Sequence, residues 1–166
     1  VCMLAGLACG AVVAATPLPG LKPGQFEWSP AIAPAGPVTV VVSLPEQRAY
    51  VYRNGVRIGV STISSGRPGF ETPSGVYTIL QKHREHYSNL YDNAPMPFMQ
   101  RLTWGGVALH AGALPGYPAS HGCVRLPRAF AEKLFEVTSA GTVVVVASGA
   151  FPPTVVTPGF FTPVDP

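Results

Sequence analysis

The sequence contains little charge, few cysteines and no long hydrophobic run. Charged residues make up 11% of the 166 residues, well under the roughly 25% usual for soluble domains. The formal net charge is +3 without a run of Lys or Arg, so a nucleic-acid partner is not indicated. No repeat or heptad pattern is visible, and the apolar stretch 1–15 is shorter than the roughly 20 residues that a transmembrane helix needs. The length fits one domain of ordinary size with a real core.

Two of the three cysteines, Cys2 and Cys9, lie in the apolar stretch 1–15, which ends in small residues. This stretch resembles the hydrophobic region of a signal peptide, so we expect an exported protein of the periplasm or cell envelope. Cys123 is the remaining cysteine. Exported proteins usually pair their cysteines, and a single one therefore points either to a reactive thiol or to an inert one.

Composition divides the rest of the chain into three parts. Residues 16–37 are rich in Pro, Gly and Ala, which predicts a linker or extended lead-in that buries little. Residues 151–166 are similarly rich in Pro and predict a C-terminal tail. The folded unit is therefore expected over 38–150.

Strand signals dominate this unit. Runs of β-branched or alternating apolar residues predict the strands, and Asn54-Gly55 between two of them is a strong hairpin turn signal. The last run is continuously apolar, which predicts a strand buried on both faces. The expected strands are 38–44, 47–53, 56–64, 75–82, 98–104, 107–110 and 142–147.

One helix interrupts the strands. It is expected to begin with Pro127 in its first turn and to end near Gly141. Its apolar face is formed by Phe130, Leu134 and Val137. The elements together predict a mainly β fold, a β-sandwich or partly closed barrel of mixed strands with one packed α-helix.

The surroundings of Cys123 favour a reactive thiol. A thiol acts as a nucleophile only as thiolate, so it needs a nearby base that is itself held in place. His110 ends a predicted strand, and the Gly- and Pro-rich loop 111–119 can fold back to bring it to Cys123. His121 is closer in sequence, but its side chain need not face the thiol. We therefore favour His110 as the base and give His121 a local role in the loop.

The neighbours of Cys123 suit acyl transfer. Gly122 permits a backbone turn that can aim N–H groups at one point, as an oxyanion hole requires. The expected donors are the amides around Gly122 and Cys123. Arg125 carries a planar guanidinium that suits a substrate carboxylate. Ser120 is expected to hydrogen-bond within the loop, because Cys123 is the better nucleophile.

Two other interpretations fit the same residues. Cys123 could be a buried structural thiol, since free Cys is among the most buried residue types. A metal site could combine Cys123 and His110 with His83 and His86, but the separations are wide and no C-x-x-C pair is present. We therefore expect no metal.

The segment Ser120-His121-Gly122-Cys123-Val124-Arg125, with His110 upstream, resembles the active-site motif of the YkuD-like L,D-transpeptidases. These are bacterial cell-wall enzymes with a cysteine nucleophile. Gly66–Tyr77 (GRPGFETPSGVY) is similar to the family's Gly-rich Thr-Pro-x-Gly segment, and the hairpin 38–64 lies where the family places it. Nine residues separate His110 from Ser120. This is fewer than in many members, so we expect a compact loop over the cleft.

The resemblance implies a role for each residue of the motif. Cys123 matches the acylated nucleophile and His110 the general base, which family members orient partly through a backbone carbonyl. The segment from His121 to Cys123 matches the oxyanion loop, and Arg125 matches a residue that contacts substrate.

The resemblance also implies a two-step reaction without metal or organic cofactor. The thiolate attacks the carbonyl after the third residue of a peptidoglycan tetrapeptide stem and releases D-alanine, and an amine then resolves the thioester. The acceptor stays open between another stem, a D-amino acid, an envelope protein and the water of an L,D-carboxypeptidase. A non-catalytic peptidoglycan-binding envelope protein is the other alternative. We expect a monomer that carbapenem-type β-lactams acylate at Cys123.

Overall fold

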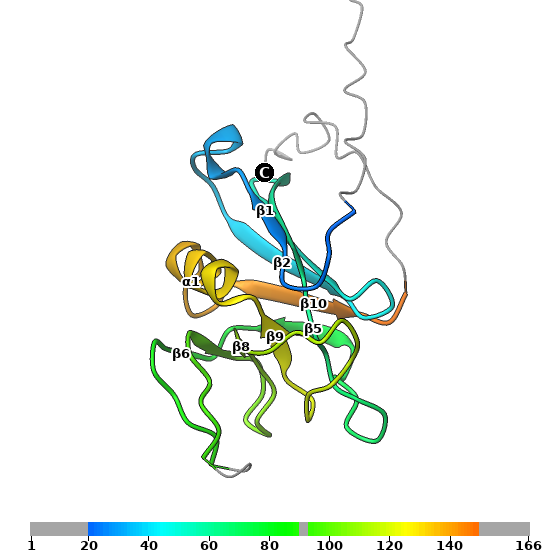
Figure 1. Cartoon of the computed structure of the whole chain (residues 1–166). Coiled ribbons are helices and arrows are strands. Elements are labelled where there is room, and N and C mark those ends of the chain that lie inside the picture. The colour runs from blue at the N-terminus through cyan, green and yellow to red at the C-terminus, as the bar shows by residue number, and fades with distance from the viewer. Residues whose placement is uncertain (1–19, 90–92, 150–166) are drawn as a thin grey trace, which may run out of the picture.

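The computed structural model of the chain describes residues 20–89 and 93–149 (Figure 1). The predicted signal peptide at 1–15 and the predicted tail at 151–166 lie outside the described residues. Within the described ranges, no helix is long and apolar enough to cross a membrane.

A six-stranded mixed sheet forms the larger layer. Its strands follow the order β1-β4-β3-β2-β10-β5, in which β2 and β10 are parallel and the other pairs antiparallel. Asn54 and Gly55 join β3 to β4 with φ angles of 49° and 76°, the left-handed conformation of a tight hairpin turn. The strands span Phe26–Trp28 (β1), Val38–Ser43 (β2), Arg48–Arg53 (β3), Val56–Thr62 (β4), Gly75–Thr78 (β5) and Val143–Ala147 (β10).

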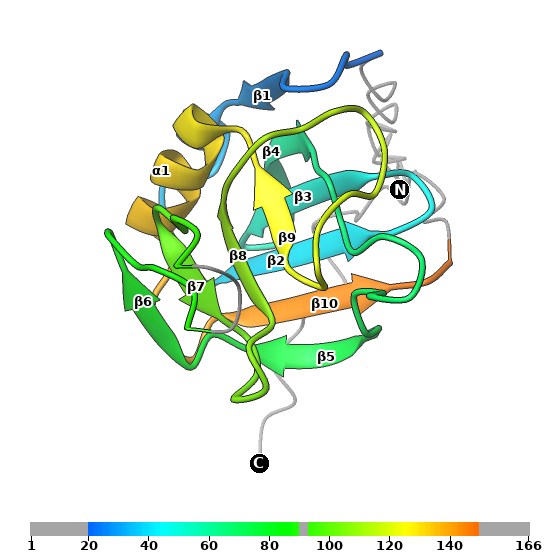
Figure 2. The same cartoon turned by 60° about the horizontal axis from the view of Figure 1, so that its bottom comes forward.

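A four-stranded sheet forms the smaller layer, in the order β6-β7-β8-β9. Within this sheet only β8 and β9 run parallel, and the other pairs are antiparallel (Figure 2). An isolated antiparallel bridge between Ser64 and Arg125 connects the two sheets just beyond the end of β4. The strands span Gln81–His83 (β6), Met99–Arg101 (β7), Ala108–Ala111 (β8) and Val124–Leu126 (β9).

The helix α1 (Arg128–Val137) and both sheets share one hydrophobic core. Phe130, Ala131 and Leu134 are the buried side chains of α1, at the i, i+1, i+4 spacing of one helix face. The end of α1 is held from β6, because the Lys82 ammonium donates hydrogen bonds to the carbonyls of Phe135 and Thr138. A cation at this end also complements the helix dipole. The predicted fold class, mainly β with one packed helix, is confirmed, and the sheets do not close into a barrel.

The lead-in predicted for 16–37 contributes more than a linker would. Phe26–Trp28 forms β1 on the edge of the larger sheet, and a 3-10 turn (η1, Pro30–Ile32) follows. The rings of Phe26 and Trp28 each lie 5.5 Å from the Phe130 ring of α1. The packed unit therefore includes residues that composition alone assigned to a linker.

Two strand predictions were wrong in detail. The strand expected at 75–82 is two strands in different sheets, because the Ile79 N–H bonds to Thr142 in the larger layer and the Leu80 N–H to Arg101 in the smaller. The strand β10 is not buried on both faces. Val144 and Val146 face the core, whereas Val143 on the other face is 37% exposed.

Candidate active site

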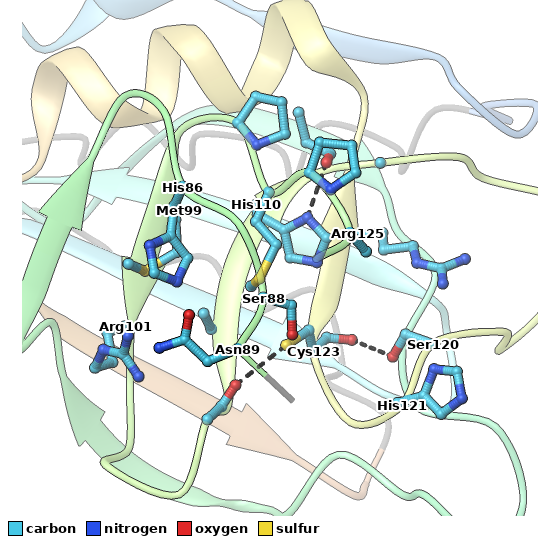
Figure 3. A pocket seen from close by; sticks show the side chains of 18 of the residues that line it. His86, Ser88, Asn89, Met99, Arg101, His110, Ser120, His121, Cys123 and Arg125 are labelled. Atoms are coloured by element: carbon cyan, nitrogen blue, oxygen red, sulfur yellow. Dashed lines mark hydrogen bonds between the residues drawn. The ribbon is translucent and has the colours of Figure 1, made fainter. Parts of the chain in front are cut away.

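The parallel pair β8 and β9 brings the predicted site residues together. Its register places His110 opposite Arg125 and Leu109 opposite Val124. Side chains two apart on a strand share a face, so Cys123 and Arg125 lie on the same face as His110. His110 and Cys123 both line one cavity (Figure 3). The structure thus brings them together through strand pairing, in addition to the loop that the sequence suggested.

His110 is a buried, neutral imidazole. Its side chain is 7% exposed, and Nδ1 lies 2.8 Å from the carbonyl oxygen of Ala111. A carbonyl only accepts hydrogen bonds, so Nδ1 carries the proton and Nε2 presents a lone pair. Burial lowers the pKa of His110 to about 4, with the Ala111 hydrogen bond opposing and the charges of Arg125 and His86 adding to the shift.

Cys123 is a partly buried thiol in an apolar cup formed by Met96, Met99 and Ala108. Its S–H donates to the carbonyl oxygen of Gly106 at 3.3 Å. Burial raises the pKa of the Cys123 thiol, against the Ala108 N–H and the charges of Arg125 and Arg101. The resting thiol is therefore protonated at neutral pH.

The turn before β9 is held by hydrogen bonds of its own. The Ser120 hydroxyl donates to the Cys123 carbonyl at 2.5 Å and accepts from the Gly122 N–H at 3.1 Å. Gly122 has φ +110°, a conformation that glycine adopts without steric cost. The Gly122 N–H, one of the two amides expected as oxyanion donors, is thus engaged within the turn.

His121 points away from the thiol (Figure 3). Its exposed ring packs edge-on against Phe70, with centroids 4.9 Å apart. His83 and His86 stack on each other at 5.8 Å near β6. Across residues 20–89 and 93–149, no three His, Cys, Asp or Glu side chains gather as a metal site would require.

The cavity has a volume of about 690 Å³ and a positively charged border, a size typical of small-ligand sites. Arg125, Arg101 and Arg128 all border it. Trp104, 70% exposed, lies at its rim. Sequence reasoning named only Arg125 among the arginines. The sequence around Arg101 does not indicate a functional residue. Its place near the site follows only from the pairing of β7 with β8, which sets Arg101 opposite Ala108.

The fold and the site define a two-sheet protein with a cysteine and a histidine at one cavity, and its fold resembles that of solved L,D-transpeptidases. An L,D-transpeptidase from Stackebrandtia nassauensis superposes with a TM-score of 0.63 at 31% identity, covering 71% of this chain and 58% of that one. L,D-transpeptidase 3 from Mycobacterium tuberculosis, in complex with a faropenem-derived adduct, superposes with a TM-score of 0.60 at 29% identity, covering 66% and 59%.

Residues 37–146 match the model of the L,D-transpeptidase catalytic domain (YkuD), and the chain belongs to this family. The "Probable L,D-transpeptidase 3" of Mycobacterium tuberculosis is 32% identical over 107 residues, which cover 53% of this chain and 38% of that protein. This chain thus spans well under half of that relative and somewhat over half of the solved ones. The family resemblance inferred from the sequence is confirmed.

Proposed function

We propose that the chain is a peptidoglycan L,D-transpeptidase in which Cys123 is the nucleophile and His110 the general base. The observation that carries this proposal is the β8–β9 register, which sets both side chains on one face at a cavity large enough for a peptide stem. The catalytic unit would comprise the described core together with β1. Export to the periplasm or cell envelope is part of the proposal, because the substrate lies there.

The first step forms a thioester. Both groups rest neutral, since the pKa of Cys123 is raised and that of His110 lowered. The thiol proton therefore moves to Nε2 as sulfur attacks the carbonyl that precedes the terminal D-alanine of the stem. The Nδ1–H bond to Ala111 supports the imidazolium that forms. The C–S bond then replaces the C–N bond, and Nε2 returns the proton to the leaving amine.

The second step transfers the acyl group. An amine of another stem attacks the thioester, Nε2 takes the amine proton, and the Cys123 sulfur leaves and recovers a proton. A protein amine, a D-amino acid or water could replace the stem amine without any change in the residues involved. Acceptor choice therefore distinguishes a transpeptidase from an L,D-carboxypeptidase, whereas donor chemistry does not.

Carboxylate recognition is proposed for Arg125. Arg125 borders the cavity, and its aliphatic part lies so close to Gly112 that a Cβ there would sit 3.0 Å from it. Arg101 borders the same cavity and donates to Gln81 at 3.1 Å. Together with Arg128 they make three cations at one cavity, which favours an anionic substrate. The carboxylates of a peptide stem meet this requirement.

Product analysis with a purified tetrapeptide muropeptide tests the proposed function. The wild-type protein should release D-alanine and yield cross-linked dimers by mass spectrometry, and Cys123→Ala should yield neither. Trimmed tripeptides without dimers would identify a carboxypeptidase. A wild-type protein that binds the muropeptide and leaves it intact would contradict the enzyme proposal and favour a non-catalytic envelope protein.

A further inference from the structure

The loop between β4 and β5 contacts the turn that carries Cys123 (Figure 2). Gly66 bridges to Ser120, and the Arg67 N–H donates to the Ser120 carbonyl at 3.0 Å. The Thr72 hydroxyl donates to the Gly122 carbonyl at 2.9 Å. This last contact joins a side chain 4% exposed to the peptide unit that immediately precedes the nucleophile.

A planar trans peptide couples the two ends of that unit. The C=O of Gly122 and the N–H of Cys123 belong to the same rigid plane and point in opposite directions. When Thr72 holds the carbonyl, it also sets the direction of the Cys123 N–H. The Gly122 N–H is engaged by Ser120 at 3.1 Å. The Cys123 N–H is therefore the main-chain donor whose aim depends on Thr72.

The Thr72 hydroxyl is itself oriented by Gly66. The Gly66 N–H donates to Thr72 Oγ1 at 2.9 Å, so the one hydroxyl proton is directed toward Gly122. Only a glycine allows this approach. A Cβ at Gly66 would sit 2.0 Å from the Phe70 carbonyl oxygen and 2.7 Å from the Thr72 nitrogen.

We propose that Thr72 is a positioning residue for the oxyanion hole, and that it acts by aiming the Cys123 N–H at the oxygen that becomes negative during acyl transfer. This inference rests on the proposed function. Thr72 does not line the cavity, and its hydroxyl acts through the Gly122–Cys123 peptide plane. Its effect is confined to reactions that pass through an oxyanion.

Two reactions of the same thiol separate this role from a general structural one. Acylation by the carbapenem imipenem passes through a tetrahedral oxyanion, whereas alkylation by iodoacetamide displaces iodide without one. Thr72→Val removes the hydroxyl at nearly constant volume. We expect it to slow acylation on the order of 100-fold, since small misplacements of an oxyanion donor cost about this much, and to leave the alkylation rate near wild type. Thr72→Ser keeps the hydroxyl and should restore acylation.

Thr62 offers a matched control, because it does not line the cavity. Its hydroxyl also accepts from a glycine N–H, that of Gly24 at 3.0 Å, and donates to a carbonyl, that of Gln25 at 3.1 Å. Thr62→Val thus removes the same pair of bonds outside the site. At a temperature where it is folded, it should keep both rates. If Thr72→Val does not fold, Thr72→Ala removes the same hydroxyl with less bulk.

Each outcome has a distinct meaning. A ratio of acylation to alkylation that falls in Thr72→Val and recovers in Thr72→Ser supports the proposal. A wild-type protein that is acylated, together with an unchanged ratio in the hydroxyl-free variant, overturns the role of Thr72 and leaves the proposed function standing. A wild-type protein that imipenem does not acylate contradicts the proposed function and the oxyanion role with it.

Discussion

The two sheets of this protein differ in the length of their strands and in the side chains that they bury. The larger sheet contains strands of six and seven residues, and the side chains that it sends into the core are mostly valine, as in β2 and β10. The smaller sheet contains strands of three or four residues and buries the large polar side chains of Gln100 and His110, whereas the buried polar residues of the larger sheet are the small Ser43, Ser61 and Thr62. Apolar burial stabilises the first, whereas hydrogen bonds position the second. Stability and reactivity should therefore respond to mutations in different sheets.

The largest effect is expected in the smaller sheet. His110→Ala should lower D-alanine release on the order of 10²- to 10⁴-fold, the usual contribution of a general base. The thermal midpoint should stay close to wild type, which circular dichroism checks. Activity that survives in His110→Ala and vanishes in His121→Ala would reverse our assignment of the base.

Acid should destabilise the protein through the same histidine. The folded-state pKa of His110 is about 4, below its ordinary 6.5. Between these two pH values the unfolded chain binds a proton at His110 and the folded chain does not. Stability present above pH 6.5 is lost as the pH falls to 4, by about 3 kcal/mol. Urea titrations at both pH values measure this loss. His110→Gln should show a correspondingly smaller loss, and an equal loss in both proteins would mean that other groups cause it.

The larger sheet should show the opposite response. Val144 is fully buried in the core and belongs to β10, which lies between β2 and β5. Val144→Ala removes two methyl groups from the core and should cost about 2 kcal/mol of unfolding free energy. Below the melting temperature its rate of D-alanine release should match wild type. A large loss of activity at full folding would show that the sheets are energetically coupled across the core.

The smallest effect is expected at the border of the cavity. Arg125→Ala should raise the KM for the muropeptide about tenfold, as the loss of a charged hydrogen bond predicts. Alkylation of Cys123 by iodoacetamide should change little. An equal decrease in both reactions would assign Arg125 a structural role at its bridge to Ser64.

The sequence predicted the larger sheet better than the smaller one. The turn dipeptide Asn54-Gly55 and the β-branched run 38–44 are recognisable from local sequence alone, and the structure contains both the hairpin and the strand. The strand β1 has three residues among Pro and Gly, and it is formed by its pairing with β4 and its packing on Phe130, neither of which has a local signal. The strand β9 lies within a polar motif, so alternation did not indicate it. The exposure of Val143 depends on which element covers β10, which a run of valines does not reveal.

The candidate site was predictable in its residues and less so in its geometry. The motif named Cys123 and His110, but their approach depends on a parallel strand pair with no local signature. The hydrogen bond from the Thr72 hydroxyl to the Gly122 carbonyl joins segments 50 positions apart. The spacing of residues along the chain does not predict such contacts.

Intact-mass analysis after incubation with imipenem tests the central claim most directly. The account predicts one covalent adduct on the wild-type protein and on Val144→Ala, a much slower adduct on His110→Ala, and none on Cys123→Ala. An adduct that persists in Cys123→Ala, or a wild-type protein that stays unmodified, would contradict the assignment of Cys123 as the nucleophile.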